Sequence, residues 1–302
     1  MSLAIHIVLL IALPLLLSCV IRKTKALMQG RPGPPLFQPI FDLVKRFRKG
    51  ETVSSTASWI FRANPLVGLS IALVVAMVVP WTGAEPLARG SGTADLILIV
   101  YLLAMARFFS LLAALDTGSA FGGLGASREA ALAVLIEPSI LVSLSAVALA
   151  SGTMDLSVAL QSPVRGTVAL LSGSAFLLAA LAELSRMPVD DPTTHLELTM
   201  IHEATILENS GRNLALIETT VALRTAVFFG VGVQILLGKA LRSPDNAIVS
   251  AASSAAAILM LGCLLGVLEG IAVKLNWRRV PSFVAFSTAL AVMSAFVAAV
   301  GA

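Results

Sequence analysis

The chain has 302 residues, of which 57% are hydrophobic and 13% are charged, with a formal net charge of +4 and a mean hydropathy of +0.93. A soluble domain of this size cannot hide that much apolar surface, so soluble enzymes and nucleic-acid-binding domains are excluded. The two cysteines, Cys19 and Cys263, both lie inside apolar runs. They are too few for a structural zinc site or an iron–sulfur cluster, each of which takes about four ligands. We therefore expect no redox cofactor and no metal in this chain.

Eight apolar runs have the length that a helix needs to cross a bilayer, which is about 20 residues. They cover approximately residues 2–21, 65–82, 95–115, 129–150, 167–186, 213–238, 246–272 and 281–301. This pattern predicts an all-α polytopic membrane protein with about eight transmembrane helices, forming one integral membrane domain over residues 1–302. No basic segment precedes the first run, so we expect no cleaved signal peptide.

Lysine and arginine are distributed unevenly between the two sides of this predicted topology. The connectors after the first, third, fifth and seventh runs hold fifteen of the 21 basic residues. The opposite side holds four, Arg89, Arg165, Lys239 and Arg242, and the last two, Arg107 and Arg224, lie inside runs. The positive-inside rule then places both termini outside, with the protein in a bacterial or archaeal cytoplasmic membrane.

The first connector, residues 30–50, predicts an amphipathic helix on the cytoplasmic side. It opens with GRPGPPLFQP, in which Gly and Pro favour a rigid, non-helical turn. Apolar side chains then recur at helical spacing among four bases, which is typical of a helix lying in the membrane interface. The apolar positions are Ile40, Phe41, Leu43, Val44 and Phe47. A purely electrostatic anchor for the topology is the alternative.

The third run contains Arg107 and is followed by DTGSAFGGLGAS, residues 116–127, which predicts a tight cytoplasmic turn. The fourth run contains Glu137 directly before Pro138. Proline removes a helical hydrogen bond and leaves the carbonyl of Val134 without its donor, so Glu137 is a candidate for a hydrated polar pocket. Alternatively, Glu137 pairs with a base on another helix. In either case it should face protein or water rather than lipid.

An acidic connector at residues 183–211, ELSRMPVDDPTTHLELTMIHEATILENSG, separates the fifth and sixth runs. Its one base, Arg186, is three residues from Glu183, so the two can meet on one helix face, and we expect Arg186 to pair within this connector. A helix over His195 to Asn209 would place Glu197 and Glu208 on a common face. The histidine spacing of a zinc-binding helix is absent. The remaining acids of the connector are Asp190, Asp191 and Glu203.

Further ionisable residues lie in the later runs. Glu218 and Arg224, in the sixth run, could pair, and snorkelling is an adequate explanation for Glu269 at the cytoplasmic end of the seventh. Burial and neighbouring carboxylates favour protonation, so acids that converge on the connector can exchange protons near neutral pH. The residues thus predict a polar cavity that opens to the cytoplasm, suited to protons or to a partner's polar group. No arrangement typical of a catalytic site is present.

Three stretches resemble the membrane subunit that anchors the redox arm of respiratory complex I, called subunit 1. GRPGPP with the amphipathic segment resembles its entry region, and Arg128 through Glu137 is similar to a segment that carries a buried glutamate. AELSRMPVDDP resembles the pattern of an acid, three residues and then R-x-P-x-D-x-P. The matches occur in the same order over most of the chain.

Two stretches depart from the complex I pattern. DTGSAFGGLGASRE and ELTMIHEATILENSG are more similar to the corresponding subunit of membrane-bound group 4 nickel–iron hydrogenases, of the formate hydrogenlyase and hydrogenase-4 type. This resemblance implies about eight transmembrane helices beneath hydrogenase large and small subunits and an iron–sulfur subunit, beside antiporter-like membrane subunits. It also implies that the nickel–iron centre and iron–sulfur clusters belong to those partners.

The leading hypothesis is therefore a non-catalytic anchor and proton-coupling subunit of a hydrogenase complex. The candidate proton path is acidic and consists of Glu137, Glu183, Asp190, Glu197, Glu203, Glu208 and Glu218. Arg128, Arg186 and Arg224 are the candidate ion-pair residues. A quinone-binding subunit of a complex I-like NADH or ferredoxin:quinone oxidoreductase is the alternative. A secondary transporter ranks last because no inverted repeat is visible, and an anchor that moves no ions stays open.

Overall fold

The computed structural model describes residues 2–85, 93–162, 164–190, 201–243 and 246–301, and this described part consists of helices and their connectors without a β-strand. The helices are α1 (Ser2–Met28), α2 (Gln38–Phe47), α3 (Trp59–Val78), α4 (Leu96–Asp116), α5 (Ala120–Ser151), α6 (Leu156–Ala159), α7 (Gly166–Glu183), α8 (His202–Ile206), α9 (Gly211–Leu241), α10 (Ala247–Ile271) and α11 (Val280–Gly301), with the short helix η1 (Trp277–Arg279) before α11.

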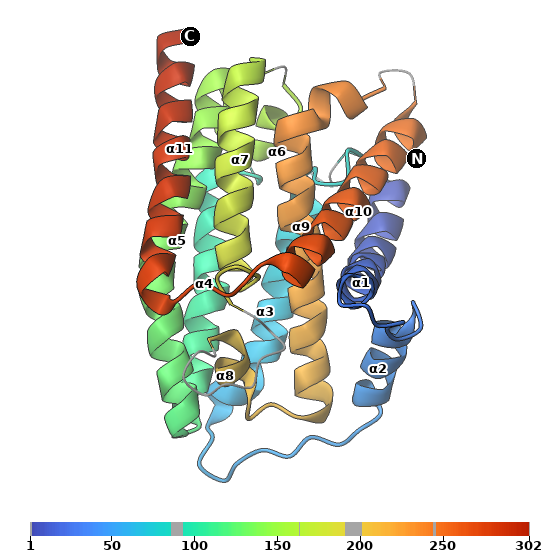
Figure 1. The fold of residues 1–302 in the computed structure, drawn as a ribbon, viewed down its shortest axis with the longest axis vertical. Coiled ribbons are helices and arrows are strands. Elements are labelled where there is room, and N and C mark those ends of the chain that lie inside the picture. Colours follow the sequence, from blue (N-terminus) through green and yellow to red (C-terminus); the bar gives the residue numbers. More distant parts are fainter. Residues whose placement is uncertain (1, 86–92, 163, 191–200, 244–245, 302) are drawn as a thin grey trace.

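Within the described residues, eight helices are long and apolar enough to cross a membrane, which confirms the predicted all-α class. They are α1, α3, α4, α5, α7, α9, α10 and η1 continued by α11. An even number of crossings returns the chain to its starting side, and both ends of the chain lie in the upper half of Figure 1. The small helix α8 lies at the other end of the bundle.

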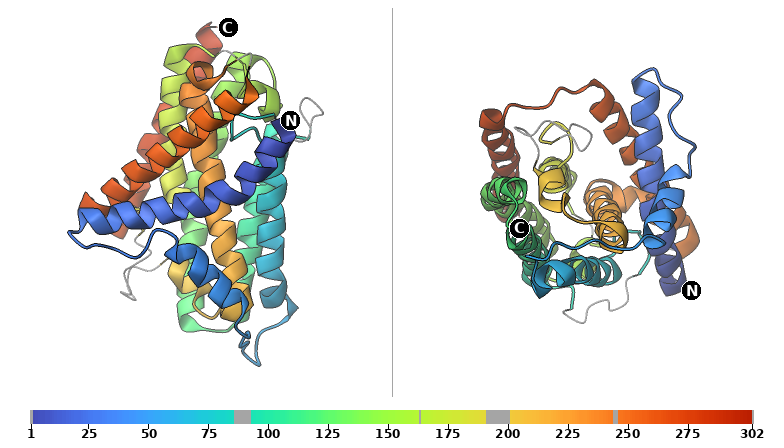
Figure 2. Two further views of the ribbon diagram at one scale, coloured as in Figure 1. Left: turned by 90° about the vertical axis from the view of Figure 1, so that its right-hand side faces the viewer. Right: turned by 90° about the horizontal axis from the view of Figure 1, so that it is seen from below.

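Most of these helices run roughly parallel, whereas α1 and α10 cross the bundle at a steep tilt (Figure 2, left). Glycine makes the contact between these two helices close. A Cβ on Gly262 would overlap the side chain of Leu17, and one on Gly266 or Gly270 would lie 2.7 Å from Thr24 or 2.6 Å from Met28. Small residues at intervals of four let helix backbones approach closely in membranes.

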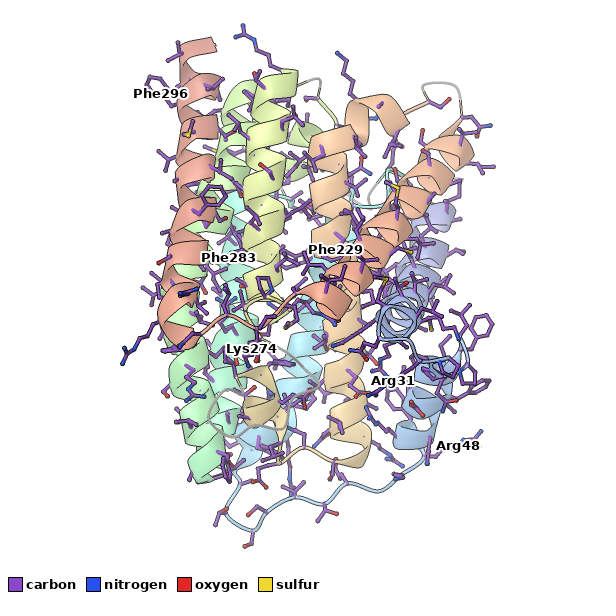
Figure 3. The ribbon with its side chains drawn as sticks, viewed as in Figure 1. Arg31, Arg48, Phe229, Lys274, Phe283 and Phe296 are labelled. Carbon is purple, nitrogen blue, oxygen red and sulfur yellow. The ribbon has the colours of Figure 1, made fainter. Side chains whose placement is uncertain are left out.

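The opposite side of the bundle is joined by hydroxyl groups between small residues. Ser139 of α5 and Ser287 of α11 share a 2.7 Å hydrogen bond, and the Ser287 hydroxyl also donates to the carbonyl of Ala175 in α7 at 2.8 Å. Such hydrogen bonds stabilise helix association where lipid offers no alternative partner. The outward faces are apolar, as at Phe296, which is 69% exposed and points away from the bundle (Figure 3).

The stretch predicted as a tight turn, residues 116–127, is instead mostly helical. α4 ends at Asp116 and α5 begins at Ala120, so the turn is confined to the residues between them. These glycines of α5 allow close packing against other helices: a Cβ on Gly122 would lie 2.6 Å from the carbonyl oxygen of Ala114 in α4, and one on Gly125 would lie 2.9 Å from Ala204 of α8. The Gly-rich composition reflects helix contacts and not a long turn.

The acidic connector also differs from its predicted local structure. α7 ends at Glu183, so Glu183 and Arg186 do not share a helix face, and Ser185 between them has a positive φ of 49°. In the second half of the connector the described helix is the short α8, His202–Ile206, and Glu208 lies in the turn that follows it. The predicted helix over 195–209 is therefore wrong at its C-terminal end, and residues 191–200 lie outside the described residues.

The amphipathic segment contains the predicted helix, α2, directly after the Pro-rich turn. No residue of α2 is buried, and Phe41 and Val44 of its apolar side are 64% and 45% exposed. A side chain on its other side, Arg46, makes an ion pair with Glu218 of α9. The helix therefore makes a polar contact with the bundle and leaves Phe41, Val44 and Phe47 of its apolar side exposed.

Candidate functional site

A network of ion pairs joins four membrane-spanning helices near the acidic connector. Glu183, the last residue of α7, has a side chain that is only 2% exposed and lies between two arginines. Arg224 of α9 donates to Glu183 Oε1 at 2.5 Å, and Arg107 of α4 donates to Glu183 Oε2. Arg107 also donates to Glu137 Oε1 of α5 at 2.6 Å. The order of contacts is Glu137, Arg107, Glu183 and Arg224.

A fifth member of this network is Glu129, one of the acids near the start of the fourth apolar run. Its carboxylate interacts electrostatically with both Arg107 and Arg224. Two polar atoms here are buried without a hydrogen-bond partner in the described structure, Glu129 Oε2 and Arg224 Nε. Buried polar groups are almost always satisfied, so a donor and an acceptor without partners are unusual in a buried ion-pair network.

The charges of this network do not balance. Two guanidinium groups, Arg107 and Arg224, face three carboxyl groups, Glu129, Glu137 and Glu183, which leaves one excess negative charge when all are ionised. Arginine does not lose its proton in proteins. Glu137 is the most exposed member of the ion pairs, with a side chain that is 38% exposed, whereas the side chain of Glu183 is 2% exposed.

A cavity of about 360 Å³ lies between α1, α8, α9, α10 and the residues after α7. It is lined by apolar residues on α9 such as Ile217, and by the acids Glu203, Glu218 and Glu269. Leu184, Ser185 and Arg186, the three residues that follow Glu183, also line it, so one turn of chain connects the buried network to the cavity. Nine of its fifteen described lining residues are polar or charged, which favours a hydrated interior.

Glu269 is the buried centre of a second ion-pair group on this cavity. Its side chain is 2% exposed, and its oxygens lie 3.4 Å from Arg186 and 3.7 Å from Lys25. Snorkelling toward water therefore does not describe Glu269. Among the described residues Arg186 pairs with Glu269 of α10 and not with an acid of its own connector, whose Asp191 and Glu197 lie outside the described residues, so the expected pairing stays a prediction. Sequence spacing gave no signal for this long-range pair.

Asp190 connects segments of the chain through an ion pair and backbone hydrogen bonds. Lys274 lies 2.5 Å from its Oδ1, and the backbone amides of Ile201 and His202 donate to its Oδ2 at 3.2 and 3.3 Å. A backbone hydrogen bond from Leu275 to the carbonyl of Pro188, at 2.8 Å, lies beside this group. Lys274 is visible in Figure 3 on the segment between α10 and α11, above α8. Asp190 thus holds α8 and the chain before η1 together.

The other predicted residues are placed as follows. Glu218 and Arg224 do not pair with each other, because Glu218 binds Arg46 and Arg224 binds Glu183. Glu137 pairs with Arg107, a base on another helix, and its side chain is 38% exposed. Glu208 is exposed and lines no described cavity, and Glu197 and Asp191 lie outside the described residues.

Arg128, the remaining candidate ion-pair residue, lies over the ring of Trp277 with 5.9 Å between its guanidinium carbon and the ring centroid. This cation–π contact connects α5 with η1. Among the described residues, no group of three or more His, Cys, Asp or Glu side chains is arranged to hold a metal ion.

The fold and the site together define a multi-pass membrane protein with a charged network among its helices and, at one end, a cavity lined by three acids and three bases. The chain belongs to the NADH dehydrogenase family, whose model matches residues 1–300. It is 35% identical over 244 residues to hydrogenase-4 component C of Escherichia coli, covering 78% of this chain and 74% of that one.

Two further relatives and one solved structure extend the comparison. Formate hydrogenlyase subunit 4 of Escherichia coli is 31% identical over 77% of this chain and 76% of its own length. A subunit of the NADH-quinone oxidoreductase of Rubrobacter xylanophilus is 30% identical over 72% of this chain and 68% of its own length. A chain of the archaeal membrane-bound sulfane sulfur reductase shares the fold, with a TM-score of 0.80 at 21% identity over 98% of this chain and 99% of that one.

Proposed function

We propose that this chain is the membrane anchor and proton-coupling subunit of a multi-subunit hydrogenase complex of the formate hydrogenlyase type, related to respiratory complex I. It links the soluble redox arm to antiporter-like membrane subunits. The similarity to hydrogenase-4 component C and formate hydrogenlyase subunit 4 supports this assignment. The proposed partners are hydrogenase large and small subunits and an iron–sulfur subunit, which hold the nickel–iron centre and the clusters.

The observation that carries the coupling role is the uneven network of two arginines and three glutamates. Its proton-carrying groups are Glu129, Glu137 and Glu183, and Glu203 and Glu218 on the cavity continue the route toward the cytoplasm. Glu197 and the exposed Glu208 belong to the outer end of the same proposed route. Asp190 serves in this proposal to shape the docking side of the connector.

The proposed orientation places the cavity in the cytoplasm and both termini outside, in the cytoplasmic membrane. The uneven distribution of lysine and arginine supports it, since the connectors near α2, α8 and η1 hold most of the bases. The redox arm then docks on the side that carries α8.

The experiment that tests this function measures two quantities on one preparation of the assembled complex. Glu129→Gln and Glu137→Gln each keep the side-chain shape and remove the titrating group, whereas Glu51→Gln changes an exposed connector acid. All three complexes should assemble and evolve hydrogen with an artificial electron carrier. Proton translocation into vesicles should fall several-fold in the two network variants and not in Glu51→Gln.

Undiminished translocation in both network variants would remove the network from the coupling route. Loss of assembly in both would instead assign it a structural role, as an anchor that moves no ions. Co-purification of this chain without any hydrogenase subunit would contradict the complex itself.

A second candidate function, quinone binding, has one observation in its favour. The 360 Å³ cavity is within the size range of small-molecule sites, and its wall residue Glu218 contacts the amphipathic helix α2. Ile217→Trp would fill the cavity beside this contact. A fall in quinone-dependent turnover in that variant, with hydrogen evolution from an artificial carrier unchanged, would favour quinone binding over proton coupling alone.

A further inference from the structure

The described structure contains a second, larger cavity at the opposite end of the bundle, the end that carries both chain termini. Its volume is about 620 Å³, and it lies between the first turns of α7, the last turns of α9, and α6 with the residues that follow it. This volume is in the range of sites that hold a small molecule. The network and the cavity described above lie at the C-terminal end of α7 and along the first half of α9, and this cavity shares no residue with either.

α7 and α9 are in close contact directly beside this cavity, at Gly173 of α7 and Gly232 of α9. A Cβ on Gly173 would lie 2.5 Å from Leu236, and one on Gly232 would overlap Leu177, so these glycines hold the two helices together. One or two turns closer to the terminal end, the facing residues of α7 are Ala169 and Gly166, and a Cβ on Gly166 would meet nothing within 4 Å. Small side chains above a tight crossing leave the space open.

The wall and the mouth of this cavity differ in chemistry. The wall is mostly aliphatic, with side chains such as Val147, Leu160 and Ile235, and it also includes the polar residues Gln161, Ser162 and Gln234. At the mouth are Lys239 and Arg242, two of the few bases at this end of the protein, and the described lining includes no acid. Arg242 is held in place by a hydrogen bond from its guanidinium to the carbonyl of Gln161. Lys239 is exposed and makes no ion pair with any described residue.

An apolar pocket with cations at its rim, at the level where the membrane-spanning helices end, matches an anionic phospholipid. α9 ends at Leu241 and α7 begins at Gly166, so Lys239 and Arg242 lie at the depth of the lipid headgroups. Lysine and arginine near a membrane surface attract anionic lipid by about 1 kcal/mol each. The N-terminus of α7 has no side-chain cap and adds a favourable partial charge for a phosphate.

We propose that this cavity binds one anionic phospholipid, with an acyl chain between α7 and α9 and the phosphate beside Lys239 and Arg242. The lipid belongs to the leaflet on the side of the chain termini. It fills the space that the small residues of α7 leave and so completes the packing of α7 against α9. Binding of this lipid to the cavity does not depend on which redox partner the complex contains.

The test uses the complex purified through a tag on this chain, stripped of lipid by extensive washing in detergent. Palmitoyl-oleoyl phosphatidylglycerol or the phosphatidylcholine of the same chains is then added, and bound lipid is counted by native mass spectrometry. We expect one retained phosphatidylglycerol, bound about fivefold or more in preference to phosphatidylcholine, since one cation contributes about this factor.

Two variants with matched controls locate the site. Lys239→Gln removes the exposed charge and should reduce phosphatidylglycerol retention about fivefold, whereas Lys45→Gln, which removes an exposed base of α2 at the opposite end, should not. Ala169→Phe fills the cavity and should abolish retention, whereas Leu170→Phe on the neighbouring outward face, where Leu170 is 63% exposed, should not.

Equal retention of the two lipids by the unaltered complex would overturn the proposal, and so would equal phosphatidylglycerol retention in Lys239→Gln and Lys45→Gln. Because Ala169→Phe changes helix packing, its complex is first compared with the unaltered one by yield and thermal unfolding temperature. If that variant does not assemble, the charge variants and the lipid comparison still decide the outcome.

Discussion

At the residue scale, Glu183 is the side chain on which the buried network depends. It accepts hydrogen bonds from Arg107 and Arg224, which come from helices far apart in the sequence. Two guanidinium groups in an apolar interior repel each other, and an acid between them offsets this repulsion by attracting both. Glu183 is therefore both a structural centre and a member of the proposed proton route, and these roles can be separated by changing it in two ways.

We expect Glu183→Leu to destabilise the protein by about 3–5 kcal/mol, because it leaves two buried arginines without their common acid. Glu183→Gln keeps one hydrogen-bond acceptor and should cost less. The measurement is the thermal unfolding temperature and the yield of the purified complex. Equal behaviour of Glu183→Leu and the unaltered chain would contradict the geometry of the network.

The pair of bases on Glu269 gives a second expectation. Glu269→Ala removes the only acid that Arg186 and Lys25 share in the described structure, whereas Arg186→Ala leaves Lys25 in place. Both variants should reduce complex yield. Glu269→Ala should have the larger effect and lower the free energy of unfolding by about 3–5 kcal/mol. A larger loss for Arg186→Ala than for Glu269→Ala would show that Arg186 has another important partner.

At the element scale, α2 is attached to the bundle through the ion pair between Arg46 and Glu218, whose side chains are 33% and 29% exposed. Partly exposed ion pairs contribute about 0.2–1 kcal/mol. Arg46→Ala should therefore loosen α2 without unfolding the protein, seen as faster hydrogen exchange of the α2 amides. Lys45→Ala, an exposed neighbour without a described ion pair, is the control. Unchanged exchange in both variants would mean that membrane contact alone positions α2.

The middle of α9 is constrained by the fully buried Trp81, whose carbonyl oxygen would lie 2.6 Å from a Cβ on Gly230. Gly230→Ala should therefore destabilise the protein, by about 1–3 kcal/mol for an overpacked site. Gly123→Ala is the matched control, since a Cβ there would meet nothing within 4 Å and alanine favours the helix by about 1 kcal/mol. Opposite changes in the unfolding temperature are expected, and a decrease in both would contradict the difference in packing.

At the scale of the whole molecule, the eight crossings place the residues before α3 and those after α5 on opposite sides of the membrane. Single cysteines at Ser55 and Met154, in a chain lacking Cys19 and Cys263, should react with an impermeant reagent from opposite sides. Ser55 should be labelled from the cytoplasm and Met154, 51% exposed, from outside. Labelling of both from one side would overturn the eight-span topology, and the reverse pattern would overturn only its orientation.

The amino-acid sequence by itself determined the membrane class, the number of spans and the position of α2, because length and hydropathy decide whether a helix can cross a bilayer. It also indicated which acids lie near the connector, since charged residues in apolar runs are few and conspicuous. Local spacing was misleading where glycine permitted close helix packing, as at Gly122 and Gly125, and where α7 ended before Arg186.

Only the tertiary structure decided which charges meet. Glu183 pairs with Arg107 and Arg224, 76 and 41 residues away, and Glu269 with Arg186, 83 residues away. A buried charge needs a partner, but the rule does not say which one, because helix order and tilt determine the neighbours. The cavity between α7 and α9 was likewise decided by the tertiary structure. A cavity forms where two helices face each other, so the sequence of either helix alone does not predict it.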